Sequence, residues 1–379
     1  MKLGVDLSSY DELQQYNPHF IYKGEEIEPF SFFAKHNHVS MVRLRLWHNP
    51  YDNNGQPYGG GTSDYDCFLR LAKKAKQQGM DILLDFHYSD FWVDPSRQKL
   101  PKAWETLSYQ ELLKAVYEYT KETLINIKKE GIDIQAIQVG NEISHGMLWP
   151  FGDINLEYSS SNGGGFQGHV ELFNQGARAC REIFPDAKIL CHLEHAGSKD
   201  MQDWYISNML SLGADFDVVG ESYYPYWHGP FKDYVDNVTN IINKFKKEVW
   251  LVEMGYEFAQ SLVEGHQNEY EHLKGEEEFR VGNINGRVPF PNDKQGQADY
   301  LKTIIEVSKK AGVSMLFYWE PAWILMENNA WAKSAGQIYC GLEPVKAYND
   351  WANATLFDFE GVANPAIDVF TQEYVDSIK

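Results

Sequence analysis

The chain has 379 residues, of which 34 are basic and 54 acidic, so its formal net charge is −20. This charge disfavours a nucleic-acid partner, whose phosphates require Lys and Arg side chains, and also a membrane surface or a polyanionic substrate. The sequence contains no run of about 18 apolar residues, the length that a membrane-spanning helix needs. Aromatic residues reach 15% of the chain, and flat rings of this kind stack on the C–H faces of sugars. We therefore expect a neutral ligand, with carbohydrate as the first candidate. We also expect the protein to be a monomer.

The N-terminus and the cysteines limit the cellular setting. The opening MKLGVDLSSY lacks the apolar segment of a signal peptide. We expect a cytoplasmic protein if Met1 is the native start, or a secreted one whose leader was removed and replaced by Met. The cysteines show no C-x-x-C spacing, which predicts buried thiols in a large domain rather than a disulfide framework. They are Cys67, Cys180, Cys191 and Cys340.

Eight short apolar runs predict buried strands over residues 3–7, 39–47, 82–87, 136–139, 188–193, 216–220, 249–252 and 314–319. Amphipathic patterns between them predict helices over residues 66–78, 109–130, 170–184, 200–212, 231–247 and 296–311. Buried strands that alternate with helices indicate a parallel sheet with helices outside it. Eight such units predict a (β/α)8 barrel, formed as a single α/β domain over residues 1–379 with long βα loops. The alternative is an open doubly wound sheet, but its usual Gly-rich first turn is replaced here by Asp6-Leu7-Ser8-Ser9.

Polar residues follow nearly every predicted strand. In a barrel of this kind the active site lies at the C-terminal ends of the strands. Two carboxyl groups there, Glu142 after the fourth strand and Glu253 after the seventh, would face each other across the barrel mouth. Glycoside hydrolysis requires such a pair, one to protonate the leaving oxygen and one on the other face of the sugar. The competing explanation is that each glutamate forms an ion pair with Arg45 or a lysine.

Five segments carry a more specific signal. They read VRLRLW (42–47), DFHYSDFWVDP (85–95), VGNEI with GMLWP (139–150), SYYPYW (222–227) and FYWEPAW (317–323). With the closing LFDF (356–359) and Gly361, these segments resemble glycoside hydrolase family 53, the endo-β-1,4-galactanases. The resemblance extends from Gly4 to about residue 365, and it implies a β-galactan or galacto-oligosaccharide substrate.

The resemblance also implies roles for individual residues. Glu142 would be the general acid/base and Glu253 the nucleophile of a retaining double displacement. The substrate-binding residues that it implies are Arg45, His87, Trp92, Asn141, Tyr223, Tyr224 and Trp319. Among these, Arg45 would keep the nucleophile ionised, Trp319 would lie under the sugar at the cleavage point, and Trp92 would form an outer sugar platform.

For the remaining residues the resemblance implies roles that two residues share. His87 and Asn141 would hydrogen-bond to sugar hydroxyls, and either Tyr223 or Tyr224 would lie beside the nucleophile.

The chain departs from the family pattern at four places. Met254 follows the nucleophile where Thr is usual, Glu221 replaces a Leu, and His195-Ala196 stands where the family shows Asn before Gly197. The calcium loop of bacterial members has no clear counterpart in residues 264–285, so we expect no cofactor and no metal. Two alternatives stay open: a related enzyme acting on another β-1,4-glycan such as mannan or glucan, and a non-catalytic sugar-binding barrel.

Other polar residues are weaker candidates. We interpret His36 and His38 as part of a surface loop, and His192 with His195 as sugar contacts or core hydrogen-bond partners, since a zinc site needs more ligands. Glu320 precedes Pro321 at a turn, which favours a structural role. Glu221 would contact sugar or pair with a basic residue.

Overall fold

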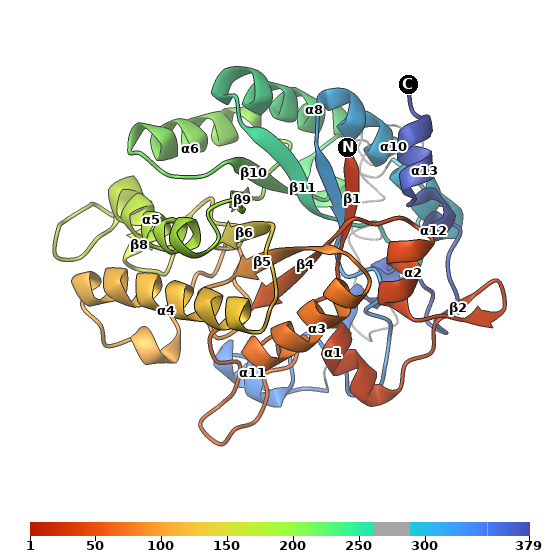
Figure 1. Ribbon diagram of the computed structural model, residues 1–379, viewed down its shortest axis with the longest axis horizontal. Helices are drawn as coiled ribbons and strands as arrows, with labels where there is room; N and C mark the ends of the chain where they lie inside the picture. The colour runs from red at the N-terminus through yellow and green to blue at the C-terminus, as the bar shows by residue number, and fades with distance from the viewer. Residues whose placement is uncertain (261–288, 347) are drawn as a thin grey trace.

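The computed structural model describes residues 1–260, 289–346 and 348–379. Eight parallel strands form a closed barrel in chain order (Figure 1). They are β1 (Lys2–Asp6), β4 (Met41–Leu46), β5 (Asp81–Phe86), β6 (Ala136–Val139), β9 (Lys188–Leu193), β10 (Val218–Tyr223), β11 (Glu248–Met254) and β12 (Met315–Tyr318). Because β1 pairs with both β4 and β12, the sheet has no edge strand. The predicted (β/α)8 barrel is confirmed, and the open doubly wound sheet is excluded.

Helices surround the barrel on its outside (Figure 1). The longer ones are α2 (Pro29–Lys35), α3 (Tyr65–Gln77), α4 (Tyr109–Lys129), α5 (Gly165–Ile183), α6 (Lys199–Ser211), α8 (Phe231–Asn240) and α10 (Lys294–Ala311). Side-chain caps fix several starts; Ser108 and Glu111, for example, form a reciprocal capping box at α4. Six of these helices match the predicted ones, although α8 ends at Asn240 and a π-helical turn (Ile241–Phe245) continues it. The sequence analysis missed α2, a helix of only seven residues.

Short elements lie in the connections. The helices are α1 (Tyr10–Leu13), α7 (Pro225–His228), α11 (Ser334–Tyr339), α12 (Ala366–Val369) and α13 (Gln372–Ser377), with 3-10 turns at Gln14–Tyr16, Lys102–Trp104 and Asp350–Ala354. Two small hairpins pair β2 (Ile21–Tyr22) with β3 (Glu25–Glu26), and β7 (Gly146–Met147) with β8 (Gly152–Asp153). These elements belong mainly to long loops, as expected for the predicted barrel.

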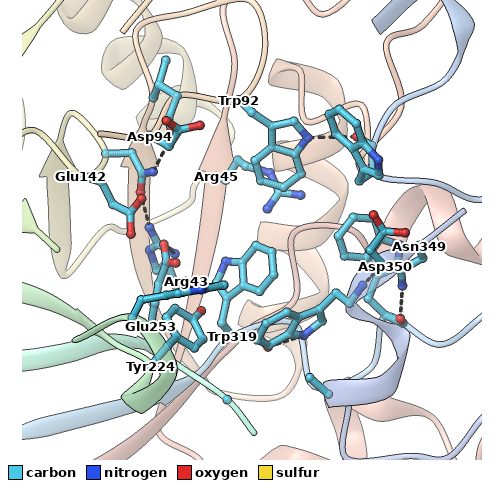
Figure 2. Close-up of a pocket in the computed structure, with 18 of the residues that line it drawn as sticks. Arg43, Arg45, Trp92, Asp94, Glu142, Tyr224, Glu253, Trp319, Asn349 and Asp350 are labelled. Atoms are coloured by element: carbon cyan, nitrogen blue, oxygen red, sulfur yellow. Dashed lines mark hydrogen bonds and ion pairs between the residues drawn. The ribbon is translucent and has the colours of Figure 1, made fainter. Parts of the chain in front are cut away.

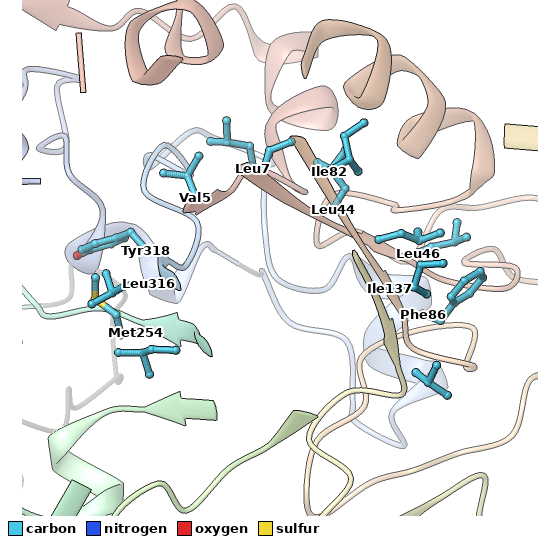
Figure 3. Close-up of a cluster of buried hydrophobic side chains, with 14 of the residues drawn as sticks. Val5, Leu7, Leu44, Leu46, Ile82, Phe86, Ile137, Met254, Leu316 and Tyr318 are labelled. Carbon is cyan, nitrogen blue, oxygen red and sulfur yellow. The ribbon is translucent and has the colours of Figure 1, made fainter. Parts of the chain in front are cut away.

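Strand alternation divides the apolar core into two layers. Side chains such as Val5, Leu44 and Leu316 point outward and pack under the helices (Figure 3). A second cluster fills the inside of the barrel, with one or two residues from most strands, among them Trp250 and Phe317. Position 4 must be glycine because a Cβ there would lie 2.3 Å from the Phe317 ring. This packed floor closes the barrel, so a ligand can enter only above it.

The pairing of β10 with β11 contains a β-bulge that places a polar side chain inside the barrel. Glu221 is opposite Leu251, but the next residue, Ser222, is opposite Glu253, so Val252 has no partner in the register. As a result, Val252 and Glu253 both face the interior, whereas Met254 returns to the outer layer. Bulges of this kind often re-aim a side chain next to an active site.

The remaining sequence expectations concern membranes, thiols and calcium. Within the described ranges, no helix is long and apolar enough to cross a membrane. All four cysteines are free, and the prediction of buried thiols is confirmed for all of them except Cys340, which is only half-buried. The stretch in which a calcium loop was sought, residues 264–285, lies outside the described residues.

Candidate active site

A cavity of about 530 Å³ lies over the C-terminal ends of the strands (Figure 2). Its size is in the range of small-molecule sites, and both Glu142 and Glu253 line it. Eight of the nine site residues predicted from the sequence line this cavity; Tyr223 does not. The walls are largely aromatic, with Trp92, Trp227, Trp319, Trp323, Trp331 and Trp351. The structure therefore brings the predicted carboxyl pair together in one cavity with indole rings.

Glu253 is held by Arg43, the central cation of the barrel mouth. Its Oε1 lies 2.7 Å from Arg43 Nη1, and the same guanidinium contacts Asp6 Oδ2 at 3.0 Å and Asp85 Oδ2 at 2.9 Å. Burial disfavours the charge on Arg43, but Asp85, Glu253 and Asp6 outweigh it and raise the pKa of Arg43. A planar guanidinium can serve several carboxylates at once. Arg43 is thus a permanent positive charge beside Glu253.

The prediction that Arg45 keeps Glu253 ionised is wrong. Arg45 Nη1 lies 3.2 Å from Glu320 Oε1, and Nη2 donates to Ser9 Oγ at 2.9 Å and to the Gly60 carbonyl at 2.7 Å. Both arginines face the barrel interior, since they are two residues apart on β4, but Arg45 stands one layer closer to the loops. Its guanidinium lies 4.2 Å from the centre of the Trp92 ring. Glu320 has the structural role that the sequence favoured, as the buried partner of Arg45 and Ser9.

Glu142 lies on a left-handed turn directly after β6. Its φ is 49° and that of Gly140 is 83°. A non-glycine residue in this region costs about 1–3 kcal/mol and persists only when its surroundings hold it. The Ile143 N–H donates to the His192 carbonyl at 3.0 Å, and the Glu142 N–H donates to His192 Nδ1 at 3.3 Å. The turn is therefore fixed against β9, with the carboxyl group directed into the cavity.

The two carboxyl groups have different electrostatic surroundings. Burial raises the pKa of Glu142 well above its usual range, and the charges of Glu253 and Glu194 raise it further. Burial also raises the pKa of Glu253, to about 7, but Arg43 opposes this effect. Within the described residues no ion pair joins Glu142 to a cation. When one proton is shared between the two groups, Glu142 therefore holds it and Glu253 is ionised.

His87 and Asn141 both line the cavity, but protein groups already occupy most of their polar atoms. His87 Nε2 lies 3.1 Å from Asp85 Oδ2, and Nδ1 accepts from Trp47 Nε1 at 3.2 Å. Burial lowers the pKa of His87, so the ring is neutral. Asn141 Oδ1 accepts from Arg43 Nη2 at 2.9 Å, and Nδ2 donates one hydrogen to the Val93 carbonyl at 2.9 Å. Of the two, Asn141 has the amide hydrogen that a ligand could still use.

Alternation along β10 separates the two tyrosines. Tyr224 lines the cavity, and burial followed by the charges of Glu253 and Glu142 raises its pKa well above the usual range. Tyr223 points into the layer under the helices, where its hydroxyl donates to the Gly229 carbonyl at 2.8 Å and its ring stacks on Tyr234. Tyr224 is therefore the tyrosine beside the two glutamates, and Tyr223 is excluded from the cavity.

The tryptophans form a connected aromatic wall. Trp319 packs edge-on against Trp351 with ring centres 4.7 Å apart, and Trp92 lies 6.1 Å from Trp319 (Figure 2). The indole N–H of Trp92 donates to the Trp331 carbonyl at 2.9 Å. The wall thus joins the loop after β5 with the long loop after β12.

The weaker candidates lie elsewhere. Glu221 does not line the cavity, and no basic residue among those the structure describes pairs with it. It accepts from Gln202 Nε2 at 3.0 Å and Asn237 Nδ2 at 3.4 Å, between barrel and helices. Glu194 lies near the Glu142 turn, where it accepts from Ser144 Oγ. No group of three or more His, Cys, Asp or Glu side chains suited to a metal ion occurs in the part of the chain that the structure describes.

Sequence reasoning missed several contributors. Ser222 accepts from His192 Nε2 at 2.9 Å and forms a hydrogen bond that lowers the pKa of Glu142 against the effect of burial. Its inward direction follows from alternation, since it is two residues from Tyr224. Asn349 and Asp350 come from a loop without a periodic pattern, so the sequence held no signal for them.

Three comparisons with known proteins agree with this geometry. The family model described as "Glycosyl hydrolase family 53" matches residues 2–370. The endo-beta-1,4-galactanase of Bacillus subtilis is 32% identical over 99% of this chain and 86% of its own length. The arabinogalactan endo-beta-1,4-galactanase of Cellvibrio japonicus is 30% identical, over 98% and 91%.

A solved structure extends the agreement to the whole fold. The GH53 catalytic domain of Ignisphaera aggregans superposes with a TM-score of 0.84 at 32% identity, covering 97% of this chain and 94% of that one. The family model matches nearly the full length of the chain. The closed barrel and the carboxyl pair at its mouth agree with that match. The chain belongs to glycosyl hydrolase family 53 and is a glycoside hydrolase.

Proposed function

We propose that this glycoside hydrolase is a retaining endo-β-1,4-galactanase, with Glu142 as general acid/base and Glu253 as nucleophile. The observation that carries the proposal is the unequal surroundings of two carboxyl groups in one cavity. Arg43 lies 2.7 Å from Glu253, whereas burial and the charge of Glu253 raise the pKa of Glu142. A retaining mechanism requires this pairing of an ionised and a protonated carboxyl group.

In the first step, a Glu253 oxygen attacks the anomeric carbon and forms a glycosyl ester. The bond from that carbon to the glycosidic oxygen breaks, and Glu142 gives its proton to the departing oxygen. Arg43 stabilises the carboxylate before attack, and its contacts with Asp6 and Asp85 keep it in place.

In the second step, the charges are redistributed. Once Glu253 is an ester it no longer repels charge on Glu142, so the pKa of Glu142 falls and it can accept a proton from water. The water oxygen bonds to the anomeric carbon, the ester bond breaks, and Glu253 leaves as a carboxylate. Ser222, which favours the ionised form of Glu142, supports this step.

The substrate class follows from the relatives and from the cavity walls. The curated relatives are named as galactanases, and a neutral glycan suits a chain of charge −20. Trp319 and Trp92 offer flat faces for sugar rings, Asn141 offers an amide hydrogen, and Tyr224 lies beside the nucleophile. His87 acts mainly by contact, because its nitrogens are engaged.

Reducing-sugar release from galactan, mannan and cellulose oligosaccharides tests the substrate. Release from galactan alone supports the proposal, and release mainly from mannan or cellulose would identify the other β-1,4-glycan enzyme. No release from any of them would favour a non-catalytic sugar-binding barrel.

NMR of the first-formed product tests the stereochemistry. We expect a β anomer at early times, before mutarotation, because two displacements restore the original configuration. An α anomer would refute the retaining mechanism and would indicate that a water molecule lies between the sugar and the second carboxylate.

A further inference from the structure

We infer that Gln98 is a positioning residue for Glu142: its side-chain amide holds the left-handed turn on which this glutamate lies. Gln98 belongs to the loop between β5 and α4, and its side chain is 2% exposed. It does not line the cavity, so it can act on the reaction only through another residue. The inference rests on the proposed function, in which Glu142 is the general acid/base.

The contacts of Gln98 converge on the backbone of this turn. Its Nε2 donates to the Asn141 carbonyl at 2.9 Å and lies 3.3 Å from the Glu142 carbonyl. A third carbonyl, that of Asp94, lies 3.2 Å away. A primary amide has two hydrogens in a fixed plane, so it can serve carbonyls from two segments together.

The rest of the turn shows why this amide matters. The N–H groups of Glu142 and Ile143 are held by His192, and the Ile143 carbonyl accepts from the Tyr205 hydroxyl at 2.9 Å. The carbonyls of Asn141 and Glu142 are the ones that Gln98 holds. Rotation of either peptide would change the direction of the Glu142 side chain. A non-glycine residue with φ of 49° would be less strained at negative φ. Hydrogen bonds to both the N–H and the carbonyl groups of the turn are therefore needed to hold it.

The main chain of Gln98 reinforces the same junction. Its carbonyl accepts from the Trp149 N–H at 2.8 Å, which ties the loop after β5 to the loop after β6. Asp94, whose carbonyl Gln98 also holds, lines the cavity beside Glu142 (Figure 2). One buried side chain therefore sets the position of the acid/base relative to the neighbouring loop after β5.

Gln98→Leu removes the donors at similar side-chain length. We expect kcat on galactan to fall roughly 10- to 100-fold with KM within about twofold, because small misplacements of a catalytic group have effects of this size. With a dinitrophenyl β-galactobioside, formation of the glycosyl ester should proceed nearly as in the wild type, since this leaving group needs little protonation. The slow second step should then be accelerated by azide, which attacks without a general base.

Three variants complete the experiment. Gln337→Leu is the matched control, because Gln337 is also 2% exposed and bonds to backbone groups far from Glu142; it should show no azide effect. Gln98→Glu tests the same role if the leucine variant does not fold. Its kcat should recover towards low pH, where the introduced carboxyl group is protonated and can donate one hydrogen bond. Glu142→Ala should show the strongest azide rescue, with a β-glycosyl azide product.

The outcomes distinguish the role of Glu142 from the role of Gln98. If Glu142→Ala shows neither leaving-group dependence nor azide rescue, the proposed role of Glu142 fails. If Glu142→Ala behaves as expected but both Gln98 variants keep wild-type kcat, or lose activity equally on both substrates without azide rescue, the role of Gln98 is refuted and Glu142 is unaffected.

Discussion

Two buried glutamates on neighbouring strands, Glu221 on β10 and Glu253 on β11, show how side-chain direction decides the chemistry of a carboxyl group. Glu253 is 8% exposed and faces the barrel interior, where Arg43 lies 2.7 Å away. Glu221 is 0% exposed and faces the helices, where the neutral amides of Gln202 and Asn237 are its donors. Both are buried, but within the described ranges Glu253 alone of the two lies beside a cation and lines the cavity.

The difference lies in which form of each group is stabilised. Burial raises the pKa of Glu221 well above its usual range, and the charge of Glu194 adds to this, so Glu221 stays protonated at neutral pH. For Glu253, Arg43 offsets burial and holds the pKa at about 7. The positive charge of Arg43 thus favours the ionised form of Glu253, which the proposed nucleophile requires, and the neutral amides around Glu221 do not.

The largest expected effect separates the two glutamates by activity. Glu253→Ala should reduce kcat on galactan by roughly 10⁴-fold or more, since loss of a nucleophile removes the covalent step. Glu221→Gln, with the same size and the same amide neighbours, should stay within about threefold of wild type. Initial rates of reducing-sugar release measure both. Comparable losses in the two variants would mean that the helix-facing carboxyl group also serves the reaction.

The next effect tests which arginine sets the charge of Glu253. Arg43→Lys loses the planar contacts with several carboxylates, so the pKa of Glu253 should rise. The acidic limb of kcat/KM then moves to higher pH, with roughly a tenfold loss at pH 6 if the shift is one unit. Arg45→Lys should move this limb much less, because Arg45 pairs with Glu320. A larger shift in the Arg45 variant would restore the interpretation made from the sequence.

A third effect compares an aromatic ring inside the cavity with one outside it. Trp319→Ala should reduce kcat/KM by roughly fivefold or more, because a stacked aromatic contact contributes about 1 kcal/mol beyond area burial. Trp204 on α6 is 50% exposed and does not line the cavity, so Trp204→Ala is the control. Equal kinetics for Trp319→Ala and the wild type would remove this ring from the sugar-binding wall.

A fourth effect concerns stability rather than activity. In the wild type, the unfolded chain releases the proton of Glu221 above about pH 4.3, whereas the folded chain keeps it. The contribution of Glu221 to the free energy of unfolding should therefore decline as pH rises above that value. Glu221→Gln removes this decline, so its Tm should exceed that of wild type by a few degrees at pH 8 and match it near pH 4. Glu343→Gln, at an exposed position, is the control and should leave the pH dependence of Tm unchanged.

The smallest expected effect is that of a chelator. Because the described residues hold no cluster of metal-binding side chains, we expect EDTA to leave activity and Tm nearly unchanged. A fall of several degrees that calcium reverses would contradict the expectation of no cofactor.

The spacing of apolar residues along the chain was enough to predict the barrel, but not the side-chain contacts at its mouth. The eight strands were found because buried parallel strands are continuous apolar runs, and the seven-residue α2 was missed because it is too short for a helical period. Alternation indicates that Arg43 and Arg45 share a face and that Tyr223 and Tyr224 do not. It cannot say which arginine reaches a glutamate on another strand, since that depends on barrel stagger and on the bulge.

Residues in the loops were harder to predict. Gln98 lies three residues beyond the DFHYSDFWVDP segment, and a lone glutamine in a loop has no pattern that distinguishes a buried amide from an exposed one. Its partners are backbone carbonyls, which every residue has. Only the fold reveals that three of them meet at one side chain.

The bulge at Val252 makes the pairing register of β11 as important as its composition. If β11 kept its length but paired with β10 without the bulge, regular alternation from Trp250 would leave Val252 inside the barrel and turn the glutamate toward the helices. An alignment of such a chain would still show an intact catalytic pair. The register of this strand against β10 is therefore a necessary check before an active enzyme is inferred from a relative's sequence, and a useful constraint on any redesign of the barrel.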